Sequence, residues 1–378
     1  MQEHDFFETI KQQYQQKLPF VVYRKPNKAH VNALLQACDT LVFTKDFTEQ
    51  GFVFSPFDTQ ENTVIIPLNK SKPLCLEQFK LPTPLSAHTD NTKLKTAVDL
   101  NKKQNHISLV QKGVEAIKKG VFKKVVLSRQ ETIDIENDNP LHILKQLLHK
   151  YQSAFVYCWY HPKVGLWLGA TPETLIKIEG GRFSIMALAG TQDFKGTTEV
   201  VWQDKEKQEQ QFVTDFIVNN IAPFVNSTKT SAVTTVKAGN LLHLKTMITA
   251  QLHPNITHLK SLIAVLHPTP AVCGLPKQAA KDFILEHENY NRAFYTGFLG
   301  ELNYEHSIAP RTGRRNIENR AYAVKRKSTQ LYVNLRCMQL ISKQALIYVG
   351  GGITKTSNAE QEWEETVSKS LVVKSILD

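Results

Sequence analysis

The chain lacks closely spaced cysteines, and this absence excludes two kinds of protein. Its five cysteines, at positions 38, 75, 158, 273 and 337, are scattered, odd in number and never form a Cys-x-x-Cys pair. A disulfide-stapled secreted scaffold and a structural zinc site both need clustered ligands or paired thiols. We therefore expect reduced thiols and a cytoplasmic protein.

Long apolar runs are also missing. No segment approaches the roughly 20 apolar residues that a membrane-spanning helix needs. The opening residues Met1 to Asp5 carry no basic segment followed by a hydrophobic run, so we expect no secretory signal. With 42% hydrophobic and 21% charged residues, the 378-residue chain has the composition of a soluble, packed protein of one large domain or two ordinary ones.

Acidic residues are outnumbered by basic ones, and the excess is local. The net charge is +11, and the segment from Arg311 to Lys327 holds seven Lys or Arg against a single Glu. Such a segment could hold phosphates electrostatically, but Tyr322 is its only aromatic residue. We expect a solvated hairpin loop. A polyanion-binding module that grips RNA or an acidic protein through this loop is the non-enzyme alternative.

Strand-like and helix-like segments occur in clusters rather than in regular βαβ order. Periodicity predicts helices over 101–119 and 140–150, near 203, after Pro276 and at the C-terminal end. Residues 71–93, rich in Pro, Ser, Thr and Lys, are expected to form a connection. This order favours a mixed, largely antiparallel α+β architecture. The expected strands are 20–23, 64–66, 124–129, 155–160, 165–170, 175–178, 183–188, 331–340 and 345–349.

Two expected helices place paired carboxylates in line with apolar residues. Glu362, Glu365 and Lys369 fall at i, i+3 and i+7 and so share one face. Glu206 and Glu209 repeat the i, i+3 spacing. Both sets continue into apolar stripes, whereas surface charge normally occupies the opposite face. Either these are solvated helix faces, or they are converging carboxylates, which suit a hard cation such as Mg²⁺.

Other chemistry-bearing positions lie at expected strand ends. Lys124 begins a β-branched strand, and Glu173 follows a Thr-Pro turn. Gly190 and Gly350 end apolar runs, where a missing Cβ lets the backbone approach a ligand. Arg336 is expected inside an apolar strand, where its planar fork suits a carboxylate partner. A solvent-facing lysine and an ordinary turn carboxylate are the simpler interpretations of Lys124 and Glu173.

The order of these motifs resembles that of a known family. The chain contains, in sequence, KVVLSR, GATPE, LAGT, KExxE, HPTPAVxGLP, RxxYxG, NLRC, GGGI and ExxExxxK. Together they resemble the chorismate-utilising enzymes, most closely the isochorismate synthases. The resemblance covers about 124 to 378 and is loose over the first 120 residues. Each motif alone is weak, whereas nine in the family's order make coincidence implausible.

The resemblance implies a fold and a division of the chain. The expected fold is the α+β chorismate-utilising enzyme fold, a large mixed or antiparallel β-sheet core of two packed sheets flanked by helices. Residues 1–95 are expected as a variable N-terminal part packing onto the same core. Residues 96–378 are expected as the chorismate-binding catalytic region, in one intertwined globular unit, with 304–328 as a basic loop insertion.

The resemblance also implies catalytic roles. Lys124 matches the general base that activates water for attack on chorismate C2, and Glu173 matches the acid that protonates the departing C4 hydroxyl. A lysine base must be largely neutral near pH 7, well below its ordinary pKa of ~10.4. Burial and cations such as Lys369 or Arg336 would lower that pKa. A glutamic acid needs the opposite shift, from an apolar wall.

A metal site and a substrate site follow from the same matches. Glu209 and Glu365 match direct Mg²⁺ ligands, and Glu206 and Glu362 match supports that act through water. The positions that match groups around the two substrate carboxylates and the enolpyruvyl arm are Gly190, Thr191, Ala271, Tyr295, Arg336, Gly350 and Lys369.

Three positions favour one reaction within the family, and a fourth leaves the choice open. Ala189 replaces the lysine nucleophile of aminodeoxychorismate synthases, and Lys124 is expected where water is the nucleophile. Ala271 lies where salicylate and anthranilate types carry threonine, whereas Tyr295 is found in members that also release pyruvate. We expect an isochorismate synthase, an isomerase of the hydroxymutase type. Salicylate synthase, which adds pyruvate loss to the same chemistry, is the alternative.

Two departures from the family pattern stand out. Gln210 replaces the histidine that usually follows the metal-ligand glutamate, so support of the metal site is expected to differ. The segment 304–328 is longer than the family's hairpin and is a candidate family-branch insertion, partner contact or steering patch for a dianionic substrate. The expected product serves menaquinone or catechol siderophore synthesis. We expect a monomer with no nucleic-acid or membrane partner.

Overall fold

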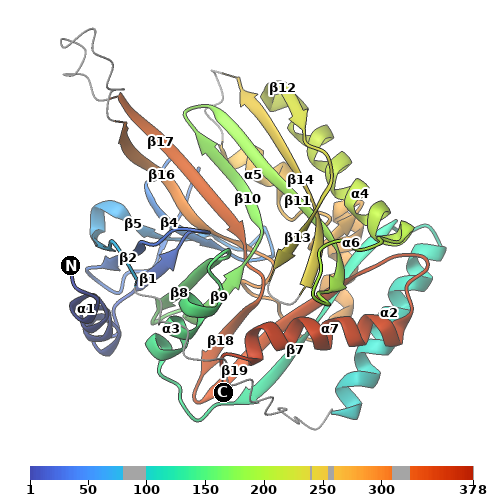
Figure 1. Ribbon diagram of the computed structural model, residues 1–378, viewed down its shortest axis with the longest axis horizontal. Coiled ribbons are helices and arrows are strands. Elements are labelled where there is room, and N and C mark those ends of the chain that lie inside the picture. The colour runs from blue at the N-terminus through green and yellow to red at the C-terminus, as the bar shows by residue number, and fades with distance from the viewer. Residues whose placement is uncertain (80–98, 239–240, 254–258, 309–323, 378) are drawn as a thin grey trace.

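The computed structural model describes residues 1–79, 99–238, 241–253, 259–308 and 324–377, and Figure 1 shows their arrangement. In chain order the elements are α1 (Glu3–Gln15), β1 (Phe20–Arg24), β2 (Val31–Gln36), β3 (Val42–Phe43), β4 (Gly51–Ser55), β5 (Val64–Pro67), η1 (Leu68–Lys70), β6 (Ser71–Leu76), α2 (Leu100–Lys118), β7 (Lys124–Asp134), α3 (Pro140–Lys150), β8 (Phe155–His161), β9 (Gly165–Thr171), β10 (Thr174–Glu179), β11 (Arg182–Asp193), α4 (Asp204–Ile221), η2 (Ala222–Phe224), β12 (Val225–Thr230), β13 (Thr234–Ala238), β14 (Leu241–Leu252), α5 (Leu259–Leu266), β15 (Gly274–Leu275), α6 (Lys277–His287), β16 (Phe298–Ile308), β17 (Val324–Val333), β18 (Cys337–Ile341), β19 (Gln344–Ile353) and α7 (Ala359–Lys374).

The strands form two antiparallel sheets. A nine-stranded sheet has the order β15-β7-β19-β18-β9-β8-β1-β2-β6, and a ten-stranded sheet has the order β12-β14-β11-β10-β17-β16-β4-β5-β3 with β13 paired to β14. The predicted α+β class with two sheets is therefore confirmed. Strands from the first 76 residues enter both sheets, β1, β2 and β6 in one and β3, β4 and β5 in the other. The proposed boundary near residue 95 stays a prediction.

The sheets pack against each other through aromatic side chains. Along β8, Phe155, Tyr157 and Trp159 enter a buried aromatic-rich cluster shared by both sheets, whereas the residues between them face a separate hydrophobic cluster. This alternation is the two-residue period of a strand buried on both faces. The Phe155 ring stacks on Tyr332 of β17 with centroids 4.0 Å apart, which joins one sheet to the other.

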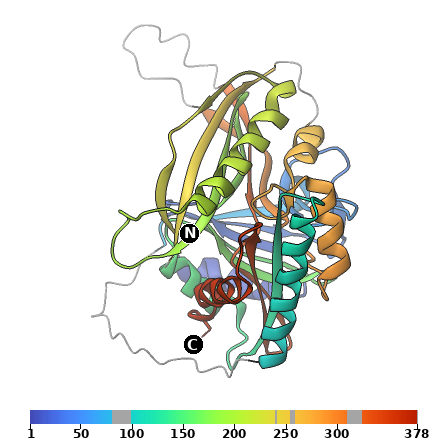
Figure 2. The same cartoon turned by 90° about the vertical axis from the view of Figure 1, so that its right-hand side faces the viewer.

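Helices cover the outer faces of the sandwich. Apolar residues of α1, α3 and α7 pack on the nine-stranded sheet, those of α4 and α5 pack on the ten-stranded sheet, and α2 and α6 pack against β7 (Figure 2). Asp99 and Asn358 cap the first turns of α2 and α7 by accepting backbone hydrogen bonds. No helix within the described ranges is long and apolar enough to cross a membrane.

The predicted strand 331–340 is wrong, because the chain breaks at Asn334–Arg336. Strand β17 ends at Val333 in the ten-stranded sheet, and β18 begins at Cys337 in the nine-stranded sheet. The backbone turns at Arg336, whose φ is 49°. Leu335 is the one apolar residue of the break, but apolar residues lie on both sides because both flanking strands are buried, so hydrophobicity alone could not reveal the crossover.

The glycine row also differs from its prediction. Gly350–Gly352 lie inside β19, not after it, and pair with Ser128, Leu127 and Val126 of β7. The predicted end of the strand at Val349 rested on the low strand propensity of glycine. Here the absence of side chains is what lets α4 and α7 approach the strand, as the site below shows.

Two predicted loops contain strand at their edges. Residues 71–76 form β6 and pair with β2, and the rest of the predicted connection from residue 80 lies outside the described residues. Within 304–328, residues 304–308 pair with 324–328. The intervening 309–323, which hold much of the basic loop, lie outside the described residues as well.

Candidate active site

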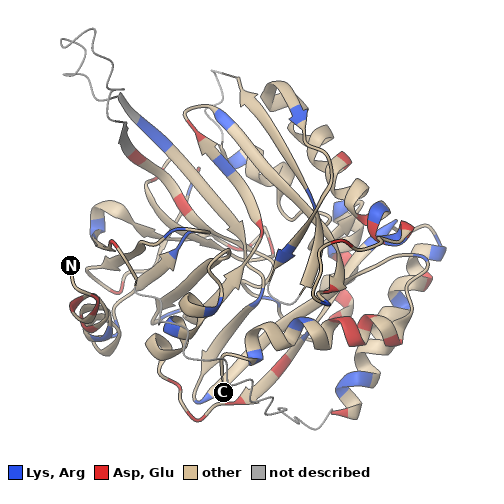
Figure 3. Ribbon diagram, in the orientation of Figure 1, with Lys and Arg blue, Asp and Glu red and all other residues tan. Residues whose placement is uncertain are grey.

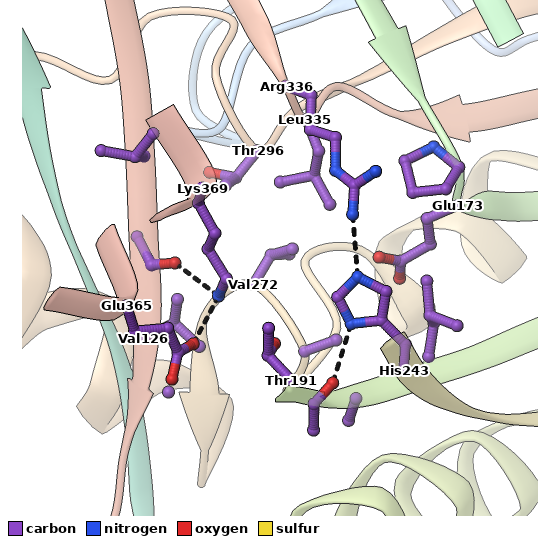
Figure 4. Close-up of a pocket in the computed structure, with 18 of the residues that line it drawn as sticks. Val126, Glu173, Thr191, His243, Val272, Thr296, Leu335, Arg336, Glu365 and Lys369 are labelled. Atoms are coloured by element: carbon purple, nitrogen blue, oxygen red, sulfur yellow. Dashed lines mark hydrogen bonds and ion pairs between the residues drawn. The ribbon is translucent and has the colours of Figure 1, made fainter. Parts of the chain in front are cut away.

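One cavity is lined by both sheets and by the helices α4 and α7. Eleven of the residues singled out from the sequence border it, and Figure 4 shows part of this lining. They are Lys124, Glu173, Gly190, Thr191, Glu209, Ala271, Tyr295, Arg336, Gly350, Glu365 and Lys369. Glu206 and Glu362 do not line it but lie at its margin, against Gly190 and Gly351 respectively.

Lys124 lies at the start of β7 with 2% of its surface exposed. The strand is held there by β15, in which Leu275 pairs with Lys124. Nζ of Lys124 is 3.7 Å from Oε1 of Glu209 on α4. The solvent-facing interpretation of this lysine is therefore excluded, and a cation bound by Glu209 would compete with Lys124 for the same carboxylate.

Glu173 follows β9 and is also buried, with 3% exposure. Its N–H donates to Thr171 Oγ1, and its carbonyl accepts from the Val333 N–H, so the turn is held on both sides. Burial raises the pKa of the Glu173 carboxyl to about 8, against the opposing effects of Lys124 and Arg336. A carboxyl with this pKa is protonated at pH 7 and can donate a proton.

Arg336 reaches the cavity from the crossover between the sheets. Its Nη1 donates to the Ala238 carbonyl at 2.9 Å, and its Nη2 donates to His243 Nε2 at 2.8 Å. Burial lowers the pKa of this guanidinium to about 10, which leaves it charged at neutral pH. The partner expected from the sequence was a carboxylate, whereas the structure supplies neutral acceptors and leaves the positive charge uncompensated by an ion pair within the described residues.

Four carboxylates on α4 and α7 lie in or beside the cavity: Glu206, Glu209, Glu362 and Glu365. Figure 3 marks the acidic and basic positions along the helices. Lys205 pairs with Glu362 at 2.6 Å, and Lys369 pairs with Glu365 at 2.7 Å. Burial and Glu365 raise the pKa of Glu362, which signals a surplus of negative charge. Three carboxylate oxygens that are buried there have no hydrogen-bond partner in the described part of the chain: Glu206 Oε2, Glu209 Oε1 and Glu362 Oε2.

The glycines of β19 make room for these carboxylates. A Cβ added at Gly352 would lie 2.3 Å from Glu209 Oε1, and one added at Gly351 would lie 3.3 Å from Glu362 Oε2. Strand and helices can therefore approach only because these positions carry no side chain. Lys369 uses the third glycine by donating to the Gly350 carbonyl at 2.9 Å.

The donor set fits a hard cation that keeps several waters. Unpartnered buried carboxylate oxygens are the ligands that Mg²⁺ takes from proteins, usually one or two at a time. The described residues contain no group of three or more His, Cys, Asp or Glu side chains arranged to hold a metal ion by themselves. Ligands from a bound acidic molecule and from water would have to complete the shell.

Gln210, the departure next to Glu209, points away from the carboxylates. Its amide donates to the Ala187 carbonyl at 3.1 Å and to Thr246 Oγ1 at 2.9 Å. The side chain thus fastens α4 to β11 and β14 of the underlying sheet. Gln210 therefore fixes Glu209 indirectly, by holding α4 in place, and makes no hydrogen bond to the Glu209 side chain.

Sequence reasoning missed His243 and the Glu288–Arg292 pair. His243 is an isolated histidine in a strand, which gives no motif. Arg292 and Glu288 are both buried and joined at 2.6 Å, and Arg292 also donates to the carbonyls of Val126 and Val272, which line the cavity. Arg292 was part of the RxxYxG motif, but its partner was not recognised. The signal that could have identified Glu288 is its position four residues before Arg292.

Comparison with known proteins agrees with the arrangement. The family pattern described as "Chorismate binding enzyme" matches residues 59–313, more than half of the chain, and a second chorismate binding enzyme pattern matches residues 321–375. Isochorismate synthase DhbC of Bacillus subtilis is 28% identical over 69% of this chain and 64% of that protein. The salicylate biosynthesis isochorismate synthase of Pseudomonas aeruginosa is 27% identical over 71% of this chain and 53% of that protein.

A solved structure extends the likeness to almost the whole fold. The crystal structure of a 2,3-dihydroxybenzoate-specific isochorismate synthase, DhbC from Bacillus anthracis, superposes with a TM-score of 0.74 at 20% identity, over 97% of this chain and 98% of the other. The sequence matches span about half to two thirds of the length of the curated relatives. The chain has two sheets and an acidic margin, and both family patterns match it. It belongs to the family of chorismate-binding enzymes.

Proposed function

We propose that this protein is an isochorismate synthase, an isomerase that converts chorismate to isochorismate. Water adds at C2 of the ring, the ring double bonds shift, and the C4 hydroxyl leaves as water. One observation carries the proposal: Lys124 and Glu173, from different strands, border the same cavity, and the pKa of Glu173 is raised to about 8. A base and a protonated acid in one site are what this exchange of hydroxyl groups requires.

Each of the two residues has one proton to move. Lys124, in its neutral amine form, takes a proton from the attacking water, and Glu173 gives a proton to the departing hydroxyl oxygen. Glu209, 3.7 Å from Lys124, is the nearest group that can hold the resulting ammonium. After product release, one proton passes from Lys124 to solvent and one returns to Glu173, so the enzyme regains its starting state.

Fixed cations and backbone groups would bind the substrate's two carboxylates. Arg336 carries a charge without an ion-pair partner, and Lys369 can exchange Glu365 for a substrate oxygen. Gly190 has a φ of 70°, a conformation that lets neighbouring N–H groups turn toward an anion. Thr191, Ala271, Tyr295 and Gly350 complete the lining.

We propose that Mg²⁺ is the cofactor. Glu209 and Glu365 would bind it directly, and Glu206 and Glu362 would support it through water. The unpartnered oxygens of three of these carboxylates are the support for this assignment. When bound, the ion supplies positive charge that neutralises a substrate carboxylate and fixes the ring.

The location and pathway are part of the proposal. A cytoplasmic protein fits the scattered, unpaired cysteines. Isochorismate would supply menaquinone or catechol siderophore synthesis, and the genes that neighbour this one in its genome would decide between them.

The product of purified protein incubated with chorismate and Mg²⁺ tests the function. Isochorismate alone is expected; salicylate with pyruvate would identify the salicylate synthase alternative, and unchanged chorismate would contradict the family reaction. Lys124→Ala and Glu173→Gln should each lower kcat by about 10²–10⁴-fold, the usual contribution of a general base or acid. The exposed neighbours Lys123→Ala and Glu179→Gln serve as matched controls and should retain turnover.

A further inference from the structure

His243 is a buried histidine that connects two parts of the cavity wall. It lies near the start of β14 with 8% exposure. Its Nδ1 is 2.8 Å from the Gly190 carbonyl on β11, and its Nε2 is 2.8 Å from Nη2 of Arg336 (Figure 4). The imidazole therefore bridges the register shift in strand β11 and the crossover that carries Arg336.

The two partners determine which nitrogen carries the proton. A carbonyl oxygen only accepts, so Nδ1 must be the donor; a guanidinium only donates, so Nε2 must offer its lone pair. A second proton on Nε2 would face an N–H of Arg336. Burial, together with Arg336, lowers the pKa of His243 to about 3, in agreement with this assignment.

A neutral acceptor has a specific effect on Arg336. A carboxylate in this position would also orient the guanidinium, but it would cancel its charge. Glu173 is close enough for its pKa to be affected by Arg336, and an unrestrained guanidinium could turn to pair with that carboxyl. The His243 bond and the Ala238 carbonyl together hold both terminal nitrogens of Arg336.

We propose that His243 is a positioning residue: as the neutral Nδ1–H tautomer, it holds Arg336 in place with its charge available to a substrate carboxylate. The proposal rests on the proposed function for the identity of that carboxylate. His243 itself moves no proton. Because Arg336 would bind the carboxylate equally in substrate and transition state, loss of His243 affects KM more than kcat.

Two substitutions separate positioning from mere filling of space. Glutamine retains one donor and one neutral acceptor, and leucine retains neither. His243→Leu should raise the KM for chorismate about tenfold or more, the scale of a lost hydrogen bond to a charged group, with kcat changed less than about threefold. His243→Gln should restore most of the KM. His106→Leu, which removes another buried histidine from outside the cavity, is the control.

A double-mutant cycle tests whether His243 acts through Arg336. In an Arg336→Ala background, His243→Leu should add less than about twofold to KM, because the group that it positions is absent. Full additivity of the two effects would overturn the proposal, as would a kcat loss in His243→Leu without a change in KM.

A last measurement is independent of the reaction. Nitrogen-15 NMR of the histidine rings, with His243 assigned by its loss in His243→Gln, should show the neutral Nδ1–H tautomer between pH 5 and 8. An Nε2–H tautomer or an imidazolium would contradict the proposal. If wild-type protein leaves chorismate unchanged, the proposed function fails while this spectrum still decides the state of His243.

Discussion

At the scale of single residues, the cavity holds carboxylates with different surroundings. Glu209 lies 3.7 Å from Nζ of Lys124. Glu173 is buried and has no ion-pair partner among the described residues. The pKa of Glu173, raised to about 8 by burial, gives this carboxyl a proton at neutral pH. Surroundings, not residue type, assign the role of acid.

The pH dependence of turnover follows from this shift. Glu173 must be protonated to donate, so kcat for isochorismate formation should be retained at pH 7 and should fall as the pH rises through about 8. The measurement is kcat against pH at saturating chorismate and Mg²⁺. A kcat that stays flat from pH 6 to 10 would remove Glu173 from the role of acid.

Two adjacent glycines offer a matched pair of substitutions. Gly352→Ala places a Cβ 2.3 Å from Glu209 Oε1 and 3.1 Å from Lys124 Cε, whereas Gly351→Ala meets Glu362 Oε2 at 3.3 Å. Gly352→Ala should therefore lower turnover by about 10²-fold or more, the scale expected for misplacing a catalytic group by roughly 1 Å, and Gly351→Ala should have a smaller effect. Turnover is compared after circular dichroism shows that both variants fold; equal losses would argue against a direct displacement of Glu209.

The residues that sequence reasoning could and could not identify differ in kind. Lys124, Glu173 and Glu365 lie in motifs whose order resembles that of the family, so their common cavity was expected. Arg336 was expected in the site but inside a strand, because local hydrophobicity cannot show that two buried strands belong to different sheets. His243 was missed, because its importance comes from partners 53 and 93 residues away.

At the scale of elements, α4 and α7 bring carboxylates to the same margin. Each helix supplies a Glu-x-x-Glu pair, and lysines on the same two helices neutralise part of the charge: Lys205 bonds Glu362, and Lys369 bonds Glu365. Burial alone would lower the pKa of Lys205, but Glu362 raises it. The helices thus carry an acidic cluster with internal counter-ions that a metal would have to displace.

Metal removal tests this pair of helices. EDTA should abolish turnover, and added Mg²⁺ should restore it. Mg²⁺ at about 100 times its Kd should also stabilise the fold by about 2.7 kcal/mol, which a thermal melt can measure without substrate. Glu209→Gln should reduce that stabilisation, whereas the exposed Glu364→Gln should not. A melt unaffected by Mg²⁺ in the wild type would contradict the proposed cofactor.

At the scale of the whole molecule, more than half of the net positive charge lies in the segment 311–327. Of the basic segment 311–327, residues 311–323 fall outside the described ranges, and the adjoining residues belong to the paired strands β16 and β17. Deleting 311–323 spares that described pairing. Chorismate turnover at high salt should survive the deletion, and retention on a polyanion column should fall.

The outcome of this deletion distinguishes two interpretations of the basic segment, as a steering patch or as part of the catalytic unit. A loss of turnover at low salt only, seen as a lower kcat/KM, would indicate electrostatic steering of the dianionic substrate. Loss of turnover at every salt concentration, in a variant that still folds, would show that the segment belongs to the catalytic unit.

Fold class was easier to predict than topology. Strand clusters and amphipathic helices indicated α+β, and strands such as β8 had clear boundaries. The pairing of β7 with β19, which joins residues 124–134 to residues 344–353, leaves no local trace in either segment. The glycines of β19 also made the predicted strand end too early. Their missing side chains allow helices from elsewhere in the sequence to approach the strand closely.

The position of β19 has a consequence for synthesis of the protein. Strand β19 comes late in the chain but lies in the interior of the nine-stranded sheet, between β7 and β18. Strand β18 alone links it to β9. While the chain grows on the ribosome, β7 and the group β9-β8-β1-β2-β6 therefore form separate pieces with no shared edge. The β18–β19 hairpin joins these pieces and carries Gly350, and α7 follows it with Glu365 and Lys369, so a nascent chain that ends before α7 lacks part of the proposed site.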